Sequence, residues 1–415
     1  MSAIDRLRRL LSADDRSAGH TRSAGERTPA IDAPDARRLQ AQLRDVDRLI
    51  RDQQKAIVGL ERQLSMLRGL QYQQMDVTTD ALHRAGMEDA DGAALQRSLT
   101  RALRIGETGN DVIVGPWTGE VGFELMYWIP FLTWLTSQGI SGDRMVVVSR
   151  GGAAPWYRHL TSRYVDILDL VSPDEFRART AGPKKQRSVG DFDKEILGRV
   201  KASQSLVDPE ILHPSVMYRL FLSLWRRRAT VSLLDDFTTY RALSNDRPVA
   251  VPGLPRDYVV AKFYFSKAFP ESAKNRAFAA EVLRTVSRQA PVVLLATGVR
   301  LDEHEDFHGV DGLDVTVVDS HTAPQKNLEL QTDIIRGSRG FVGTYGGFSY
   351  LAPFYGVPSL SFFSDRTRFE SHHLDIAYRV FTGETHGRFV ALDRRDFDIV
   401  QPAVDRWAAA SASTP

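Results

Sequence analysis

Two glycine-containing loops carry residue types suited to acid–base and phosphate chemistry. The first is GPWTGEVGFELMYW, where Glu120 lies between glycines and Glu124 falls in the first turn of the helix that follows. A carboxylate in such a place can take the proton of a hydroxyl group. Glu120 is therefore the first candidate for a general base and Glu124 the second. The alternative for each is an acid that stabilises a helix N-terminus through the helix dipole.

The second loop is the glycine turn in VGTYGGFSYLAPFYGVPSLSFFS, between a strand and a helix. A helix N-terminus offers free N–H groups to a phosphate, and glycine lets the phosphate approach the backbone. The hydroxyl groups of the turn can donate further hydrogen bonds. The candidate phosphate site consists of Thr344, Tyr345, Gly346, Gly347 and Ser349. The alternative is a turn that serves only to pack the helix on the sheet.

Cations follow a strand in AKFYFSKAFPESAKNR, where Lys262, Ser266 and Lys267 could bind and neutralise a diphosphate. Solvated surface lysines are the alternative, although Lys262 lies within an apolar strand where an unpaired charge is costly. The acidic and histidine-rich stretch at 302–308 could bind a metal or be a solvated loop, and its irregular spacing favours the loop.

Alternating strand and helix patterns predict that two Rossmann-like α/β units in tandem position these loops. In the first unit, DVIVG and RMVVVSRGG are typical of buried strands, and FELMYWIPFLTWLTSQG between them is typical of a helix. In the second, DYVVAKFYF, PVVLLATG, LDVTVVDS, RGFVGTYGG and VPSLSFFS are expected strands separated by helices. Ligands in such sheets bind outside the carboxyl ends of the strands, so both loops should face one cleft if the two units oppose each other.

The N-terminal part of the chain has a different pattern. Apolar residues spaced alternately by four and three from Leu39 to Leu67 form a heptad seam, which predicts a coiled coil and self-association through residues 39–67. A single helix packed on the body is the alternative. The expected organisation is a disordered tail (1–35), a coiled-coil helix (36–72), a helical linker (73–110), an N-terminal Rossmann-like domain (111–245), a C-terminal Rossmann-like domain (246–385), and a C-terminal helix and tail (386–415).

The segment NLELQTDIIRGSRGFVGTYGGFSYLAPFYGVPSLSFFS resembles the donor-site segment of heptosyltransferase-type glycosyltransferases of the GT-B fold. The residues that fit the family pattern are Gly343, Gly347, Leu351, Ala352, Gly356, Val357 and Pro358. The family typically has Asp and His where this chain has Tyr345 and Tyr350. The resemblance therefore implies the fold and a nucleotide-sugar donor, but not heptose as the sugar.

The resemblance implies transfer of a sugar from a nucleotide-activated donor, bound by the second unit, to a hydroxyl acceptor on a glycan or protein. We expect an inverting transfer without a metal or cofactor, in which the nucleotide sugar is a substrate. His213 and Arg219 could line the acceptor side, and a structural role for them is the alternative. An enzyme like the non-hydrolysing nucleotide-sugar epimerases, or a non-catalytic scaffold acting through the coiled coil, are the other hypotheses.

Composition limits the partners of the chain. Among 415 residues, 54 are Lys or Arg and 52 are Asp or Glu, so the net charge of +2 gives no general case for nucleic acid. There is no cysteine, which excludes disulfides and thiolate chemistry and fits the reducing cytoplasm, where we expect the chain. No apolar run approaches the roughly 20 residues of a membrane helix, so at most a peripheral contact of the N-terminus with a membrane is expected.

Overall fold

The computed structural model describes residues 48, 55, 99–100, 102–105, 108–181, 186–226, 231–243, 251–297, 305–318, 323–365, 371–382, 386–395, 402 and 404–406. The chain divides into two compact units, Met1–Met87 and Glu88–Pro415. In the first unit only Arg48 and Lys55 are described, and both are helical. The expected tail and the rest of the heptad segment lie outside the described residues, so the coiled coil and the self-association stay predictions. All the other described residues belong to the second unit.

The first sheet of this second unit is parallel, with strand order β3-β2-β1-β4. Its strands are β1 (Val112–Val114), β2 (Met145–Ser149), β3 (Tyr164–Asp166) and β4 (Glu210–Leu212). Every residue of β1 and β2 is buried, as expected for parallel strands covered on both faces. The helices of this region are α4 (Val121–Phe123), η2 (Glu124–Trp128), α5 (Ile129–Ser137), α6 (Ala154–Tyr157), α7 (Pro173–Thr180), α8 (Asp191–Ser203), α9 (Ser215–Leu220), α10 (Leu222–Trp225) and α11 (Ser232–Phe237).

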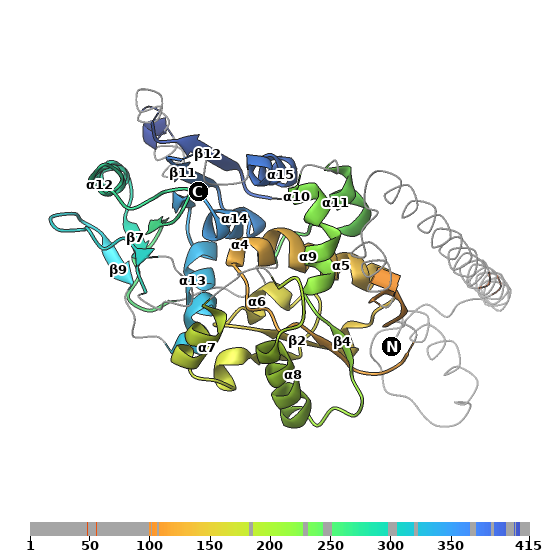
Figure 1. Cartoon of the computed structure of the whole chain (residues 1–415). Coiled ribbons are helices and arrows are strands. Elements are labelled where there is room, and N and C mark those ends of the chain that lie inside the picture. Colours follow the sequence, from red (N-terminus) through yellow and green to blue (C-terminus); the bar gives the residue numbers. More distant parts are fainter. Residues whose placement is uncertain are drawn as a thin grey trace, which may run out of the picture. The chain divides into compact units, whose positions relative to one another are not determined.

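The second sheet is also parallel, with strand order β12-β11-β10-β5-β7-β9. Its strands are β5 (Val259–Lys262), β7 (Val292–Leu295), β9 (Thr316–Val318), β10 (Gly340–Thr344), β11 (Ser359–Phe363) and β12 (Phe389–Asp393), and a separate antiparallel pair joins β6 (Tyr264–Phe265) to β8 (Glu305–Asp306). Its helices are α12 (Ala273–Ser287), α13 (Asn327–Arg336), α14 (Gly347–Phe354) and α15 (Ser371–Phe381), and Figure 1 shows α14 next to α4 of the first region.

The expected fold class, two Rossmann-like α/β regions in tandem, is confirmed in the described residues. One element departs from the expected organisation, because β12 lies within the stretch assigned to a C-terminal helix and tail (386–415) and pairs with β11. Only alternate residues of β12 are buried. Five residues with one buried face give a weak strand pattern, which explains why the sequence did not reveal that the sheet continues beyond residue 385.

The helix expected after β1 forms with an irregular turn that matters for the site. Residues Glu124–Trp128 make a π-helical turn, η2, between α4 and α5. Pro130 follows at the start of α5 and has no N–H to donate to the preceding turn. The hydroxyl of Tyr240 donates to the carbonyl of Met126 at 2.9 Å, and the amide of Thr239 donates to the carbonyl of Pro130 at 3.0 Å. The segment that leaves α11 therefore fixes the turn that carries Glu124.

Candidate functional site

Strand order places both glycine loops at positions where parallel sheets bind ligands. In the first sheet the order reverses between β1 and β4, and residues 115–120, here called the first loop, follow β1. In the second sheet the order reverses between β5 and β10, and residues 344–349, here called the glycine turn, begin at the end of β10. Ligands bind at the carboxyl ends of strands where the order reverses. The sequence had no means of showing this order.

The two loops meet at the helices that follow them. A Cβ atom on Gly347 would lie 2.8 Å from the backbone nitrogen of Gly122 and 2.8 Å from a side-chain carbon of Val121. Such distances are shorter than any real contact of a Cβ atom, so only glycine allows the starts of α4 and α14 to lie this close. The two loops are thus joined through their helices, Gly347 has a packing role there, and a shared ligand cleft stays a prediction.

The hydroxyl groups of the glycine turn are used within the protein. The Thr344 hydroxyl donates to the carbonyl of Tyr264 at 2.9 Å and accepts from its amide at 3.0 Å. The Ser349 hydroxyl donates to the carbonyl of Gly346 at 2.8 Å. Gly346 has φ of +147°, which favours glycine. Among the described residues the amides of Gly347 and Phe348 have no protein acceptor, so these amides, and not the hydroxyls, are open to an anion.

Tyr345 belongs to an aromatic layer beneath the turn. Its ring contacts Tyr350 and Phe363 edge-on, with centroids 5.7 and 5.9 Å apart. Tyr345 is 6% exposed, and burial raises the pKa of its hydroxyl. The two tyrosines that replace the polar residues of the resembled family pattern therefore pack against each other.

Lys262, at the end of β5, has a partner. Its ammonium lies 3.0 Å from a carboxylate oxygen of Asp306 and 4.8 Å from the centroid of the Phe348 ring. The side chains of Lys262 and Asp306 are only 5% and 15% exposed. Asp306 comes from the stretch at 302–308, of which only 305–308 is described, so part of this stretch is docked on the sheet. Lys267 is exposed, whereas the Ser266 hydroxyl accepts from the amide of Phe269 at 3.3 Å.

The first loop is held by side chains from other elements. The amide of Trp117 donates to the carbonyl of Val148 at 2.9 Å. Gln186 binds the loop twice, accepting from the amide of Thr118 at 3.0 Å and donating to the carbonyl of Pro116 at 2.8 Å. Glu120 ends the loop with extended backbone and a partly buried side chain. Within the described ranges no hydrogen bond or ion pair engages its carboxylate.

Glu124, four residues later, has the opposite environment. It is fully buried and accepts hydrogen bonds from the hydroxyls of Ser149 and Tyr157, both at 2.6 Å, and from the guanidinium of Arg150 at 2.9 Å. Burial raises the pKa of this carboxyl, and Arg150 and the hydroxyl donors oppose the rise. The structure therefore brings Glu120 to the junction of the loops but encloses Glu124 within the protein.

The partners of Glu124 were not predicted from the sequence. Ser149 and Arg150 end the strand pattern RMVVVSRGG, and a polar pair at the carboxyl end of a buried strand was a signal that could have identified them. Tyr157 on α6 and Gln186 before α8 gave no such signal, because nothing local in the sequence shows what they contact.

His213 and Arg219 both bind the protein itself. His213 follows β4, its Nδ1 accepts from the amide of Ser215 at 3.1 Å, and its Nε2 lies 3.3 Å from a carboxylate oxygen of Asp193. Arg219 donates through Nε to the carbonyl of Arg187 at 3.0 Å. His213 is close to the reversal of strand order in the first sheet, but these contacts correspond to the structural alternative.

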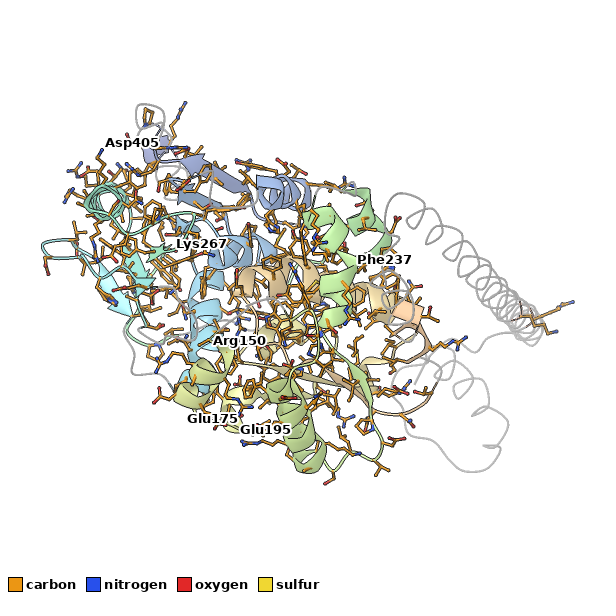
Figure 2. The ribbon with its side chains drawn as sticks, in the orientation of Figure 1. Arg150, Glu175, Glu195, Phe237, Lys267 and Asp405 are labelled. Atoms are coloured by element: carbon orange, nitrogen blue, oxygen red, sulfur yellow. The ribbon has the colours of Figure 1, made fainter. Side chains whose placement is uncertain are left out.

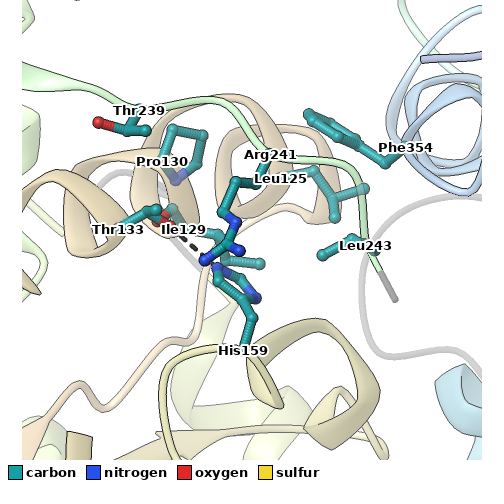
Figure 3. A pocket seen from close by; sticks show the side chains of 9 residues that line it. All are labelled: Leu125, Ile129, Pro130, Thr133, His159, Thr239, Arg241, Leu243 and Phe354. Atoms are coloured by element: carbon teal, nitrogen blue, oxygen red, sulfur yellow. Dashed lines mark hydrogen bonds between the residues drawn. The ribbon is translucent and has the colours of Figure 1, made fainter. Parts of the chain in front are cut away.

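A small pocket lies behind η2, and Figure 3 shows its lining. The lining residues are Leu125, Ile129, Pro130, Thr133, His159, Thr239, Arg241, Leu243 and Phe354. The imidazole of His159 contacts the Thr133 hydroxyl at 3.0 Å. Burial, together with the nearby Arg241 guanidinium, lowers the pKa of His159 to about 4. The pocket is mostly apolar, and its imidazole is neutral at neutral pH.

The described part of the chain contains neither a membrane-spanning helix nor a metal-binding cluster. None of its helices combines the length and the apolar character needed to cross a membrane. Within the same ranges, no three His, Asp or Glu side chains are grouped closely enough to bind a metal ion.

No protein-family model matches the sequence, and no curated protein matches it. Solved structures do match. ADP-heptose lipopolysaccharide heptosyltransferase II of E. coli is 12% identical over 72% of this chain and 99% of that chain, with a TM-score of 0.37. Heptosyltransferase WaaC of E. coli, solved with ADP, is 14% identical over 71% and 99%, with a TM-score of 0.36. Spinosyn rhamnosyltransferase SpnG is 13% identical over 73% and 94%, with a TM-score of 0.30. By their names, two of these structures are heptosyltransferases and the third is a rhamnosyltransferase.

Proposed function

We propose that the chain is a glycosyltransferase that moves a sugar from a nucleotide-activated donor to a hydroxyl group of a glycan or protein acceptor. One observation carries the proposal. The first loop, which ends in an unpaired carboxylate, and the glycine turn, which presents open amides, come together through Gly122 and Gly347. This junction supports the proposal, because it joins a carboxylate suited to accept a proton to a helix start suited to bind an anion.

In the proposed reaction, the carboxylate of Glu120 takes the proton of the acceptor hydroxyl. The acceptor oxygen attacks the anomeric carbon from the face opposite the diphosphate, and the bond between that carbon and the diphosphate oxygen breaks. The configuration at the anomeric carbon is therefore inverted. The sugar leaves on the acceptor, and the nucleoside diphosphate leaves with the electron pair of the broken bond.

The departing diphosphate needs positive charge as its own charge develops. We assign this role to the amides of Gly347 and Phe348 at the start of α14, and to the exposed Lys267 after β6. Lys262 contributes less, because Asp306 already balances its charge. These groups supply the stabilisation that a metal ion supplies in other sites, and we propose that the transfer proceeds without one.

The test is Glu120→Gln, made once thermal shifts with a panel of nucleotide sugars have identified the donor. Its turnover should fall by about 10²–10⁴-fold, the usual effect of losing a general base, while donor affinity measured by calorimetry stays unchanged. Glu175→Gln, which alters a partly buried carboxylate on α7, is the matched control and should keep the normal rate.

Other outcomes would point to other functions. A normal rate in Glu120→Gln, or strong inhibition by EDTA, would contradict the proposed mechanism. Conversion of the nucleotide sugar without any acceptor would favour the epimerase hypothesis. Binding of the donor without turnover by any acceptor would favour the scaffold hypothesis.

A further inference from the structure

One arginine links the first loop to the helix that follows it. Arg150 comes directly after β2 and is 5% exposed at its side chain. One guanidinium nitrogen donates to the carboxylate of Glu124 at 2.9 Å, and the other terminal nitrogen donates to the carbonyl of Gly119 at 2.5 Å. Figure 2 labels Arg150, which is buried in the structure. Gly119 immediately precedes Glu120, so the link ends one residue from the proposed base.

The other end of the link is fixed. Glu124 is fully buried and also accepts from Ser149 and Tyr157, which belong to β2 and α6. A carboxylate held by three donors has one position, and its charge is balanced by Arg150. The rigid guanidinium therefore transmits that position to the backbone carbonyl of Gly119.

Among the described residues, the other hydrogen bond at this end of the first loop runs from the amide of Glu124 to the carbonyl of Glu120, at 3.1 Å. Gly119 has no side chain, and the Glu120 carboxylate has no partner within the described ranges. A Cβ atom on Gly119 would lie 2.9 Å from the Tyr218 hydroxyl and 3.1 Å from the Trp117 ring, so these side chains pack against the residue where a side chain would point. The contacts of Gln186 are with Pro116 and Thr118, further from the base.

We infer that Arg150 is a positioning residue for Glu120, and that the side chain of Glu124 acts on the base only through Arg150. This inference rests on the proposed function, in which Glu120 takes the proton of the acceptor. Because the charges of Arg150 and Glu124 balance each other, the two residues act on Glu120 by fixing its position. Displacement of a reacting group by about 1 Å can cost about 10²-fold in rate.

The kinetic test uses Arg150→Met, Glu124→Gln and the double variant in the full chain. Arg150→Met should lower kcat by about 10²-fold and leave donor affinity within about twofold, because no donor contact is removed. The double variant should be no slower than Arg150→Met, since the two residues act as one unit. Arg150→Lys should recover part of the rate, because an ammonium reaches one of the two partners but does not bridge both.

A second measurement does not depend on turnover. Hydrogen exchange of the amides of residues 117–120 should become about tenfold faster in Arg150→Met, and the double variant keeps this test usable if a lone buried Glu124 prevents folding. Arg163→Met is the matched control, because Arg163 binds Asp111 at the amino end of β1 in the same sheet. Its loop exchange and kcat should stay normal.

Three results would overturn the inference: a normal kcat in Arg150→Met, additive losses in the double variant, or unchanged exchange at residues 117–120. Failure of the proposed function would look different, since Glu120→Gln would then be without effect or no nucleotide sugar would be consumed. In that case the exchange measurement still decides whether Arg150 holds the loop.

Discussion

The first loop and the glycine turn occupy equivalent places in their sheets but are fixed by different means. Side chains from distant elements hold the first loop, through Gln186 and Arg150. The turn's own hydroxyls hold the glycine turn: Thr344 binds the backbone of Tyr264 on β6, and Ser349 binds the carbonyl of Gly346. Only the first loop ends in a carboxylate, and the glycine turn contains no charged residue.

Under the proposed function, this difference separates two chemical tasks. Distant side chains hold the first loop without using its terminal carboxylate, which stays open to accept a proton. The hydroxyls of Thr344 and Ser349 fix the glycine turn without using the first amides of α14, which have no acceptor among the described residues. Each region also has a buried ion pair near a strand end, Glu124 with Arg150 and Lys262 with Asp306. Substitutions in these ion pairs can test whether the two loops are fixed by different contacts.

The largest effect is expected from Lys262→Met. This change leaves Asp306 buried without its cation, and breaking such a pair costs about 3–5 kcal/mol, nearer the lower value because Asp306 keeps some exposure. Urea unfolding at pH 7 measures the loss. Removing both charges with Asp306→Asn should restore most of the stability. Normal stability combined with lost nucleotide binding would instead show that Lys262 is a phosphate ligand.

An intermediate effect is expected at the contact between the regions. Gly347→Ala places a Cβ atom 2.8 Å from the backbone nitrogen of Gly122, and such overpacking costs about 1–3 kcal/mol. Gly122→Ala is the matched control, because its Cβ atom would lie 3.6 Å from the Cα atom of Gly347, an ordinary contact. It should be neutral or slightly stabilising, since alanine favours helix. Equal losses in both variants, measured by thermal unfolding, would contradict the described contact.

The sequence predicted the framework of both regions better than their contacts. Strands such as β1 and β2 are uninterrupted apolar runs, so their burial and the loops that follow them could be recognised locally. The bonds that decide which polar groups stay open join residues far apart in the chain. Lys262 and Asp306 are 44 positions apart, and Thr344 and Tyr264 are 80 apart. A local pattern contains no information about such partners.

Glu120 and Glu124 illustrate the same limit. Both are acids near the start of one helix, and the sequence assigned both to proton transfer. Their burial is set by η2 and by β2, which turn Glu124 toward Ser149 and leave Glu120 at the junction. The hydroxyls of Thr344 and Ser349 are a similar case, because a hydroxyl after a strand can bind either a phosphate or the backbone.

The smallest effect concerns the response of the first region to acid. His159, between α6 and β3, has a pKa lowered to about 4 in the folded chain, against an ordinary value of 6.5. Between these values the unfolded chain binds a proton that the folded chain does not. The contribution of His159 to the free energy of unfolding is therefore present in full above about pH 6.5, and this contribution is lost as the pH falls toward 4. Glu124, whose pKa is raised in the folded chain, acts in the opposite direction.

The contribution of His159 can be isolated by difference. Lowering the pH from 7.5 to 5.5 should reduce the free energy of unfolding by about 1 kcal/mol through His159. The variant His159→Gln should lack this part of the loss. Glu124 and the other titrating groups are the same in both proteins, so their effects cancel when the two urea-unfolding series are subtracted. Identical pH dependence in the two proteins would mean that His159 is solvated like a surface histidine, and that the pocket behind η2 admits water freely.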